Sequence, residues 1–120
     1  SDCIKIERVA LNLMDSVNGD NDGYIPDEKT ICPDAPSAYF TQLPVKKLRD
    51  CLIQIGIPAK TSSSAGLYVC NRTYFAALHH IASTGRNTKA VFIHLPKISD
   101  GWPLSKLLKA VKQLILATIS

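Results

Sequence analysis

Ser63-Ser64-Ala65-Gly66-Leu67-Tyr68-Val69-Cys70-Asn71 is the stretch that decides the fold, because it joins a strand-like segment to a helical one. Residues 57–62, Ile-Pro-Ala-Lys-Thr-Ser, precede it and are typical of a short strand with a proline near its start. Residues 70–83 follow it, and their apolar side chains recur at helical spacing as far as Thr84-Gly85. The stretch is therefore predicted to be a small-residue turn that leads from a strand into a helix.

The alternation of strands and helices continues on both sides of this turn. Residues 4–13 are predicted to form a strand whose alternating apolar order slips at Glu7-Arg8, and the polar residues 15–36 a hairpin or long loop. The other predicted elements are a helix over 45–55 that begins after Pro44 and ends at Gly56, a buried strand over 89–95, and a helix over 104–115 entered through Gly101-Trp102-Pro103. This order predicts an α/β fold, an open three-layer sandwich with a mostly parallel sheet flanked by helices.

The bulk composition is that of one folded domain. With 120 residues, 46% hydrophobic and 20% charged, the chain can build a single core. We expect residues 1–120 to form a single, partial catalytic domain. The clusters Lys46-Lys47-Arg49 and Lys106-Lys109-Lys112 lie on predicted helices without interleaved aromatic residues, which is typical of solvated faces rather than of a nucleic-acid site. Apolar runs such as residues 114–119 are too short to span a bilayer.

The spacing of the cysteines and histidines argues against a metal site. The four cysteines contain no Cys-x-x-Cys pair, so we expect reduced thiols in a cytoplasmic protein, with Cys51 facing the core. His79 and His80 point about 100° apart on a helix, so they are predicted to be a core-edge and a surface residue rather than a ligand pair. The carboxylates over residues 15–28 do not follow the order of a calcium loop, and turn formation is the preferred interpretation.

Cys70 and His94 are the candidate nucleophile and base. A thiol at the start of a helix lies near unpaired N–H groups and the positive end of the helix dipole, which favour the thiolate form. His94 ends the predicted strand Val91-Phe92-Ile93-His94-Leu95-Pro96. Because the carboxyl ends of parallel strands share one edge of a sheet, Cys70 and His94 are predicted to meet there as a base–nucleophile pair. A buried inert cysteine and a structural histidine are the ordinary alternatives.

Two further residues are candidates for this site. Glu7 is a charged residue in an otherwise apolar strand, where a carboxylate needs a partner, so it is the candidate for orienting the imidazole of His94. A salt bridge with Arg8 is its alternative role. Asn71, next to Cys70, either positions a substrate or caps the helix.

Five segments of the chain resemble the pyroglutamyl peptidase I family of cysteine peptidases, which remove an N-terminal pyroglutamyl residue. They are residues 6–12, 38–44, 56–59, 64–71 and 91–96, and the separation of 24 positions between Cys70 and His94 is also similar to that of the family. The resemblance implies Cys70 as nucleophile, His94 as general base, Glu7 as its orienting group, a thioester intermediate, and no metal or organic cofactor. It further implies a peptide substrate with an N-terminal pyroglutamate, and a homo-oligomer as one possible assembly, without a nucleic-acid or membrane partner.

The chain departs from the family pattern in two places. Family members carry a further N-terminal portion with a Gly/Phe-rich turn that grips the pyroglutamyl ring, and a loop arginine that Val17 replaces here. We therefore expect a partial domain that, made alone, is marginally stable or aggregates, with absent or much reduced activity. Two other hypotheses stay open: a catalytically impaired homologue that serves as an interaction scaffold, and a different cysteine hydrolase on a similar sheet.

Overall fold

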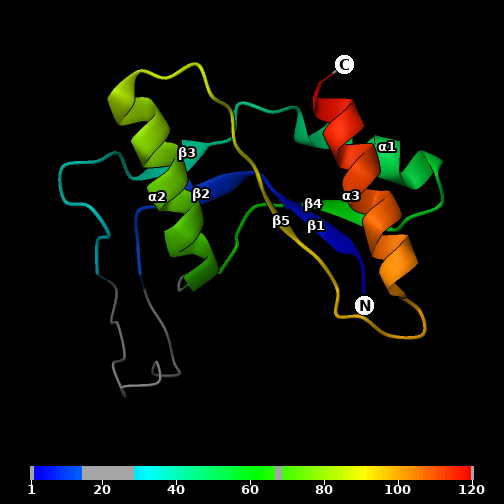
Figure 1. Ribbon diagram of the computed structural model, residues 1–120. Coiled ribbons are helices and arrows are strands. Elements are labelled where there is room, and N and C mark those ends of the chain that lie inside the picture. Colours follow the sequence, from blue (N-terminus) through cyan, green and yellow to red (C-terminus); the bar gives the residue numbers. More distant parts are fainter. Residues whose placement is uncertain (1, 15–28, 67–68, 120) are drawn as a thin grey trace.

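The computed structural model describes residues 2–14, 29–66 and 69–119 of the chain (Figure 1). Its strands and helices are, in chain order, β1 (Ile4–Glu7), β2 (Val9–Leu11), β3 (Ala38–Phe40), α1 (Val45–Gln54), β4 (Ala59–Ser62), α2 (Val69–Thr84), β5 (Phe92–His94) and α3 (Leu104–Thr118). The predicted α/β fold class is confirmed, and each predicted helix is present within a few residues of its predicted ends. The substitution at Val17 and the acidic stretch over 15–28 lie outside the described residues.

The central sheet has the strand order β4-β1-β5 and is mixed. β1 and β4 run parallel, with Ile4 opposite Ala59, whereas β5 runs antiparallel to β1, with His94 opposite Lys5. The prediction of a buried strand over 89–95 parallel to the first is therefore wrong in direction, and the strand is shorter and only half-buried. The reason is that α2 packs against β2 and β3 instead of lying back along the central sheet as a crossover helix would, so the chain enters β5 from the opposite end.

A second sheet pairs β2 with β3 in antiparallel order. The slip predicted at Glu7-Arg8 is confirmed, because Arg8 separates β1 from β2 and serves both sheets. The main-chain N–H of Arg8 donates to the carbonyl of Ser62 (2.8 Å), and its carbonyl accepts from the N–H of Thr41 (3.0 Å). The short strand β3 was not predicted, because three residues are too few to display a period. Met14 and Lys29 form an antiparallel bridge, and the connection between them lies outside the described residues.

Helices α1 and α3 cover one face of the central sheet, and α2 packs against the second sheet (Figure 1). Ile4 and Ile6 of β1 point into a core shared with α1 and α3, whose buried members include Leu48, Trp102 and Leu114. The residues of the second core are Ala10, Tyr74, Phe75 and Leu78, with Phe92 of β5 packed against them. Within the described ranges, no helix combines the length and apolarity that a membrane crossing requires.

The first core makes a direct prediction about stability. Leu48 of α1 has no exposed surface, whereas Leu108 of α3 is 60% exposed. Leu48→Ala removes buried methyl groups and leaves a cavity, so it should lower the free energy of unfolding by about 2–5 kcal/mol in urea denaturation. The same substitution at Leu108 should change it by no more than about 0.5 kcal/mol. Equal losses from the two variants would contradict this assignment of the core.

Candidate active site

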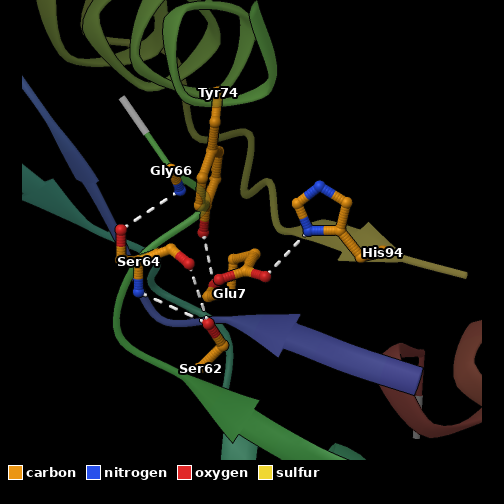
Figure 2. Close-up of polar contacts among 6 residues, drawn as sticks. All are labelled: Glu7, Ser62, Ser64, Gly66, Tyr74 and His94. Carbon is orange, nitrogen blue, oxygen red and sulfur yellow. Dashed lines mark hydrogen bonds and ion pairs between the residues drawn. The ribbon is translucent and has the colours of Figure 1, made fainter. Parts of the chain in front are cut away.

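Glu7 and His94 form the polar centre of the fold. The carboxylate of Glu7, at the end of β1, is completely buried, and its Oε2 lies 2.9 Å from Nδ1 of His94 on β5 (Figure 2). The side chain of His94 is 35% exposed. One member of the pair is thus enclosed by the protein and the other reaches solvent, as expected of a base held in place by a buried orienting group.

The register of β1 and β5 puts these two side chains together. Lys5 is paired with His94 and Glu7 with Phe92. Side chains that lie opposite one another share a face, and so do residues two apart on one strand, so Glu7 and His94 are diagonal neighbours on the same face. The other face carries Ile4 and Ile6 toward α1 and α3. The partner of the Glu7 carboxylate is the partly exposed His94 rather than Arg8, whose guanidinium donates to Oγ1 of Thr61.

The hydrogen bond defines which nitrogen of His94 is available for chemistry. An ionised carboxylate can only accept a hydrogen bond, so Nδ1–H of His94 donates to Glu7, and Nε2 of the neutral ring keeps its lone pair. The second carboxylate oxygen of Glu7, Oε1, is buried and has no hydrogen-bond partner within the described parts of the chain. The pair can therefore take up a proton at Nε2 while the carboxylate stabilises the resulting imidazolium.

Tyr74 of α2 closes the site from the side opposite α1 and α3. Its hydroxyl donates to the main-chain carbonyl of Glu7 (2.9 Å), and its ring packs against Phe92, which in turn contacts the ring of His94. Burial raises the pKa of Tyr74 above its ordinary value of 10.0, and the negative charge of Glu7 raises it further, while hydrogen bonding with Thr41 and Phe92 works in the opposite direction. The phenol therefore stays neutral beside the carboxylate.

A turn of small residues borders the same region. Oγ of Ser62 donates to the carbonyl of Ser64, whose own hydroxyl accepts from the N–H of Gly66 (Figure 2). Gly66 has φ +83°, a left-handed conformation that suits glycine. A pocket of about 390 Å³ opens between this turn and the Glu7–His94 pair. The predicted turn between β4 and α2 is confirmed for residues 63–66, and residues 67–68 lie outside the description.

Cys70 is the second residue of α2 and is partly exposed. Its position at the start of a helix is as predicted. Within the described ranges, however, its sulfur has no hydrogen bond with His94 and does not line the pocket beside the Glu7–His94 pair. The argument that both residues lie at one carboxyl edge of a parallel sheet fails, because β5 runs antiparallel to β1. The structure joins Glu7 to His94, and the approach of Cys70 to His94 stays a prediction.

Asn71 anchors the start of α2 to β2. The residue is 1% exposed, and its Oδ1 accepts from the N–H of Leu11 (2.9 Å). Its Nδ2 donates to the carbonyls of Leu11 (2.8 Å) and Leu13 (3.2 Å). Both amide hydrogens and the oxygen are thus occupied by the main chain. These bonds hold the helix that carries Cys70, and they take up the groups that a substrate contact would need, so substrate binding by Asn71 stays a prediction without structural support.

Tyr74 is the site residue that the sequence interpretation missed. The available signal was its spacing, since Asn71, Tyr74, Phe75 and Leu78 follow a helical period and are the buried face of α2. The predicted core-edge position of His79 and surface position of His80 are confirmed, and Cys51 packs partly buried against the first core. The described residues contain no group of three or more histidine, cysteine or acidic side chains placed to hold a metal ion.

Comparison with known proteins assigns the family. A family model described as pyroglutamyl peptidase matches residues 1–113. The chain belongs to the pyroglutamyl peptidase family. It is 48% identical over 97 residues to the pyrrolidone-carboxylate peptidase of Thermococcus onnurineus, covering 81% of this chain and 48% of that protein. It is 41% identical over 113 residues to that of Bacillus subtilis, covering 94% of this chain and 51% of that protein.

Solved structures of this peptidase family share the fold. The pyrrolidone carboxyl peptidase of Pyrococcus furiosus superposes with a TM-score of 0.91 at 36% identity, covering 99% of this chain and 64% of that one. The pyrrolidone carboxyl peptidase of Thermococcus litoralis superposes with a TM-score of 0.90 at 36% identity, covering 99% of this chain and 60% of that one. The chain thus spans about half the length of the curated relatives it matches. The resemblance to the family stated from five sequence segments is confirmed.

The raised pKa of Tyr74 predicts how stability changes at alkaline pH. The folded state keeps the phenol proton at a pH where the unfolded chain loses it, so stability is lost as pH rises above about 10. Tyr74→Phe should not show the alkaline loss of stability that comes from this phenol. The variant should be about 1 kcal/mol less stable at neutral pH because one hydrogen bond is gone. Urea denaturation between about pH 8 and 11 measures both effects. Parallel pH dependences in the two proteins would refute the assignment.

The anchoring of α2 by Asn71 can be tested with paired substitutions. Asn71→Ala leaves buried main-chain groups unpaired and should cost about 1–3 kcal/mol in the free energy of unfolding. Asn71→Asp should cost more, because a carboxylate would replace the donor that faces two carbonyl oxygens. Asn87→Ala, in an exposed segment, is the control and should change stability by no more than about 0.5 kcal/mol. An Asn71→Asp variant as stable as the unsubstituted chain would be incompatible with these hydrogen bonds.

Proposed function

We propose that this chain carries the catalytic residues of a cysteine peptidase that hydrolyses the bond after an N-terminal pyroglutamyl residue. The observation that supports it best is the buried carboxylate of Glu7 held 2.9 Å from Nδ1 of a partly exposed histidine, in a chain of the pyroglutamyl peptidase family. Glu7 orients His94, His94 is the general base, and Cys70 is the nucleophile. The names of the relatives support the substrate class.

The free nitrogen of His94 transfers protons in both halves of the mechanism, formation of the thioester and its hydrolysis. With Nδ1 held by Glu7, Nε2 accepts the proton of Cys70, and the thiolate attacks the carbonyl carbon of the pyroglutamyl residue. Main-chain N–H groups at the start of α2 stabilise the oxyanion. His94 then protonates the leaving amine. It next deprotonates the water that attacks the thioester, the C–S bond breaks, and His94 returns the proton to the departing sulfur of Cys70. The cycle requires neither a metal nor an organic cofactor.

Cys70 has to approach His94 for this mechanism to operate. The hydrogen bonds of Asn71 hold the first turn of α2 to β2, and the bond from Tyr74 to Glu7 holds the next turn of the helix to β1. The second of these attachments connects the helix that bears the nucleophile directly to the strand that bears the orienting carboxylate. A peptide bound in the pocket beside Glu7 and His94 would complete the arrangement between the two sides.

One observation favours the second candidate function, an inert homologue that serves as a scaffold. The sulfur of Cys70 has no hydrogen-bond partner among the described residues, whereas an activated nucleophile is expected near its base. The two candidates differ in whether Cys70, Glu7 and His94 act together on a substrate. This difference can be measured directly.

A chimera tests the proposal, because the chain spans about half the length of its relatives. In the pyrrolidone-carboxylate peptidase of Thermococcus kodakarensis, which is 50% identical over 93 residues, the matched segment would be replaced by this chain. The chimera should hydrolyse a fluorogenic pyroglutamyl amide, and the 120-residue chain alone should show little or no turnover. Cys70→Ser in the chimera should reduce hydrolysis to background, and Glu7→Gln should lower kcat by about 100-fold or more, because His94 loses its orienting charge.

The controls separate catalysis from folding. Cys51→Ser, at a thiol packed against the core and distant in sequence from the site, should retain at least about half of the kcat of the parent chimera. Circular dichroism reports whether each variant is folded. A folded chimera without hydrolysis, or one whose activity survives Cys70→Ser, would refute the peptidase proposal and leave the scaffold interpretation.

A further inference from the structure

His79 of α2, nine positions beyond Cys70 along the helix, lies beside a thiol from another part of the chain. Sγ of Cys32 is 3.7 Å from Nε2 of His79, and the other ring nitrogen of His79, Nδ1, is 2.8 Å from the hydroxyl of Tyr39 on β3. Cys32 comes from the segment before β3, and it is partly exposed. None of these three side chains takes part in the proposed peptidase mechanism.

The surrounding contacts hold both members of this pair. The ring of His79 stacks on Phe75 with an interplanar angle of 12° and a centroid distance of 5.9 Å. The main chain of Cys32 is held by the side chain of Asn12, whose Oδ1 accepts from the Cys32 N–H (2.9 Å) and whose Nδ2 donates to the Cys32 carbonyl (2.7 Å). These contacts hold the ring of His79 and the main chain of Cys32 on either side of the sulfur–imidazole contact.

The arrangement has the three parts of an activated nucleophile. When Nδ1–H of His79 donates to the oxygen of Tyr39, Nε2 has the free lone pair and faces the thiol of Cys32. His79 can then accept the thiol proton, and the thiolate is the form of cysteine that reacts with electrophiles. The hydroxyl of Ser83 lies 3.4 Å from Nε2 and 3.5 Å from Nδ1 of His79, so it competes with the thiol for Nε2.

We propose that Cys32 is a second reactive thiol of this chain, a modification site for small electrophiles and peroxides that is independent of the peptidase site. With hydrogen peroxide, the sulfur attacks one oxygen and the O–O bond breaks, giving a sulfenic acid. The departing hydroxide takes the proton held by His79 and leaves as water, so sulfur is oxidised by two electrons and peroxide is reduced. With iodoacetamide, an S–C bond forms and iodide leaves, while the proton passes from His79 to solvent.

Cys51 is the internal reference for this proposal. It is also partly buried, but it packs against the apolar core formed by α1 and α3, and its sulfur has no hydrogen-bond partner in the described part of the chain. The two thiols differ in whether a histidine lies beside the sulfur. A difference in their reaction rates at one pH therefore reports the effect of His79.

The sequence permits each thiol to be followed separately. Trypsin cleaves after lysine and arginine and puts every cysteine in its own peptide, namely residues 1–5, 30–46, 50–60 and 61–72. The 120-residue chain would be labelled with limiting iodoacetamide at neutral pH, and the four rates measured by mass spectrometry. Cys32 should react about tenfold faster than Cys51. A peroxide pulse followed by a sulfenic-acid probe should mark the 30–46 peptide before the 50–60 peptide.

Substitutions at the histidine and the tyrosine connect the rate to the geometry. His79→Gln should lower the Cys32 rate to that of Cys51, and Tyr39→Phe, which keeps the ring and removes the hydroxyl, should lower it several-fold. His80→Gln changes the exposed neighbour on the same helix and should leave the Cys32 rate unchanged. Faster labelling of Cys51 in His79→Gln would show that this variant has a loosened fold. In that case the Cys32 rate of Tyr39→Phe is the measurement that tests the proposal.

Three results would overturn the proposal. The first is labelling of Cys32 no faster than Cys51 in the unsubstituted chain. The second is a Cys32 rate unaffected by His79→Gln with Cys51 unchanged, and the third is a rate unaffected by Tyr39→Phe. None of these depends on hydrolysis of a peptide, so the proposal can fail while the proposed peptidase function stands, and the reverse also holds.

Discussion

The burial of one carboxylate constrains much of this structure. Glu7 has no exposed surface, and a charge in that position costs several kcal/mol unless a partner offsets it. His94 is that partner, and it can reach Glu7 only if β5 lies beside β1 in the observed register. A slip of one residue would turn Glu7 toward the apolar core of Ile4 and Ile6, where no partner exists among the described core residues. Strand pairing and site chemistry therefore depend on each other.

Helix α2 is attached both to β1, which carries the buried carboxylate, and to β2, which follows it. Asn71 binds the main chain of β2, and Tyr74 binds the last residue of β1. Three residues apart on a helix, these side chains lie on one face, so the same buried face that packs the second core also carries the polar anchors. The position of Cys70, one residue before Asn71, follows from these bonds rather than from any contact of its own sulfur.

The sequence was sufficient to predict those features that depend on the local pattern of residues. The helices follow from apolar spacing, with Pro44 before α1 and Gly56 after it, and the need of Glu7 for a partner follows from its charge in an apolar strand. The direction of β5 could not be predicted, because alternation of side chains is the same for either direction of a strand. The contact between Cys32 and His79 joins residues 47 positions apart, and only the packing of α2 on β3 brings them together.

His94 and His79 differ in the group behind the imidazole, and this difference indicates different chemistry. Behind His94 is a buried carboxylate, which stabilises the imidazolium formed when the ring takes a proton and keeps that proton available for a leaving group. Behind His79 is the hydroxyl of Tyr39, which is not a carboxylate and offers no such stabilisation. The first arrangement therefore suits a cycle in which a proton is taken and returned. The second suits a single capture step, after which the sulfur stays modified and the proton goes to solvent or to the leaving group.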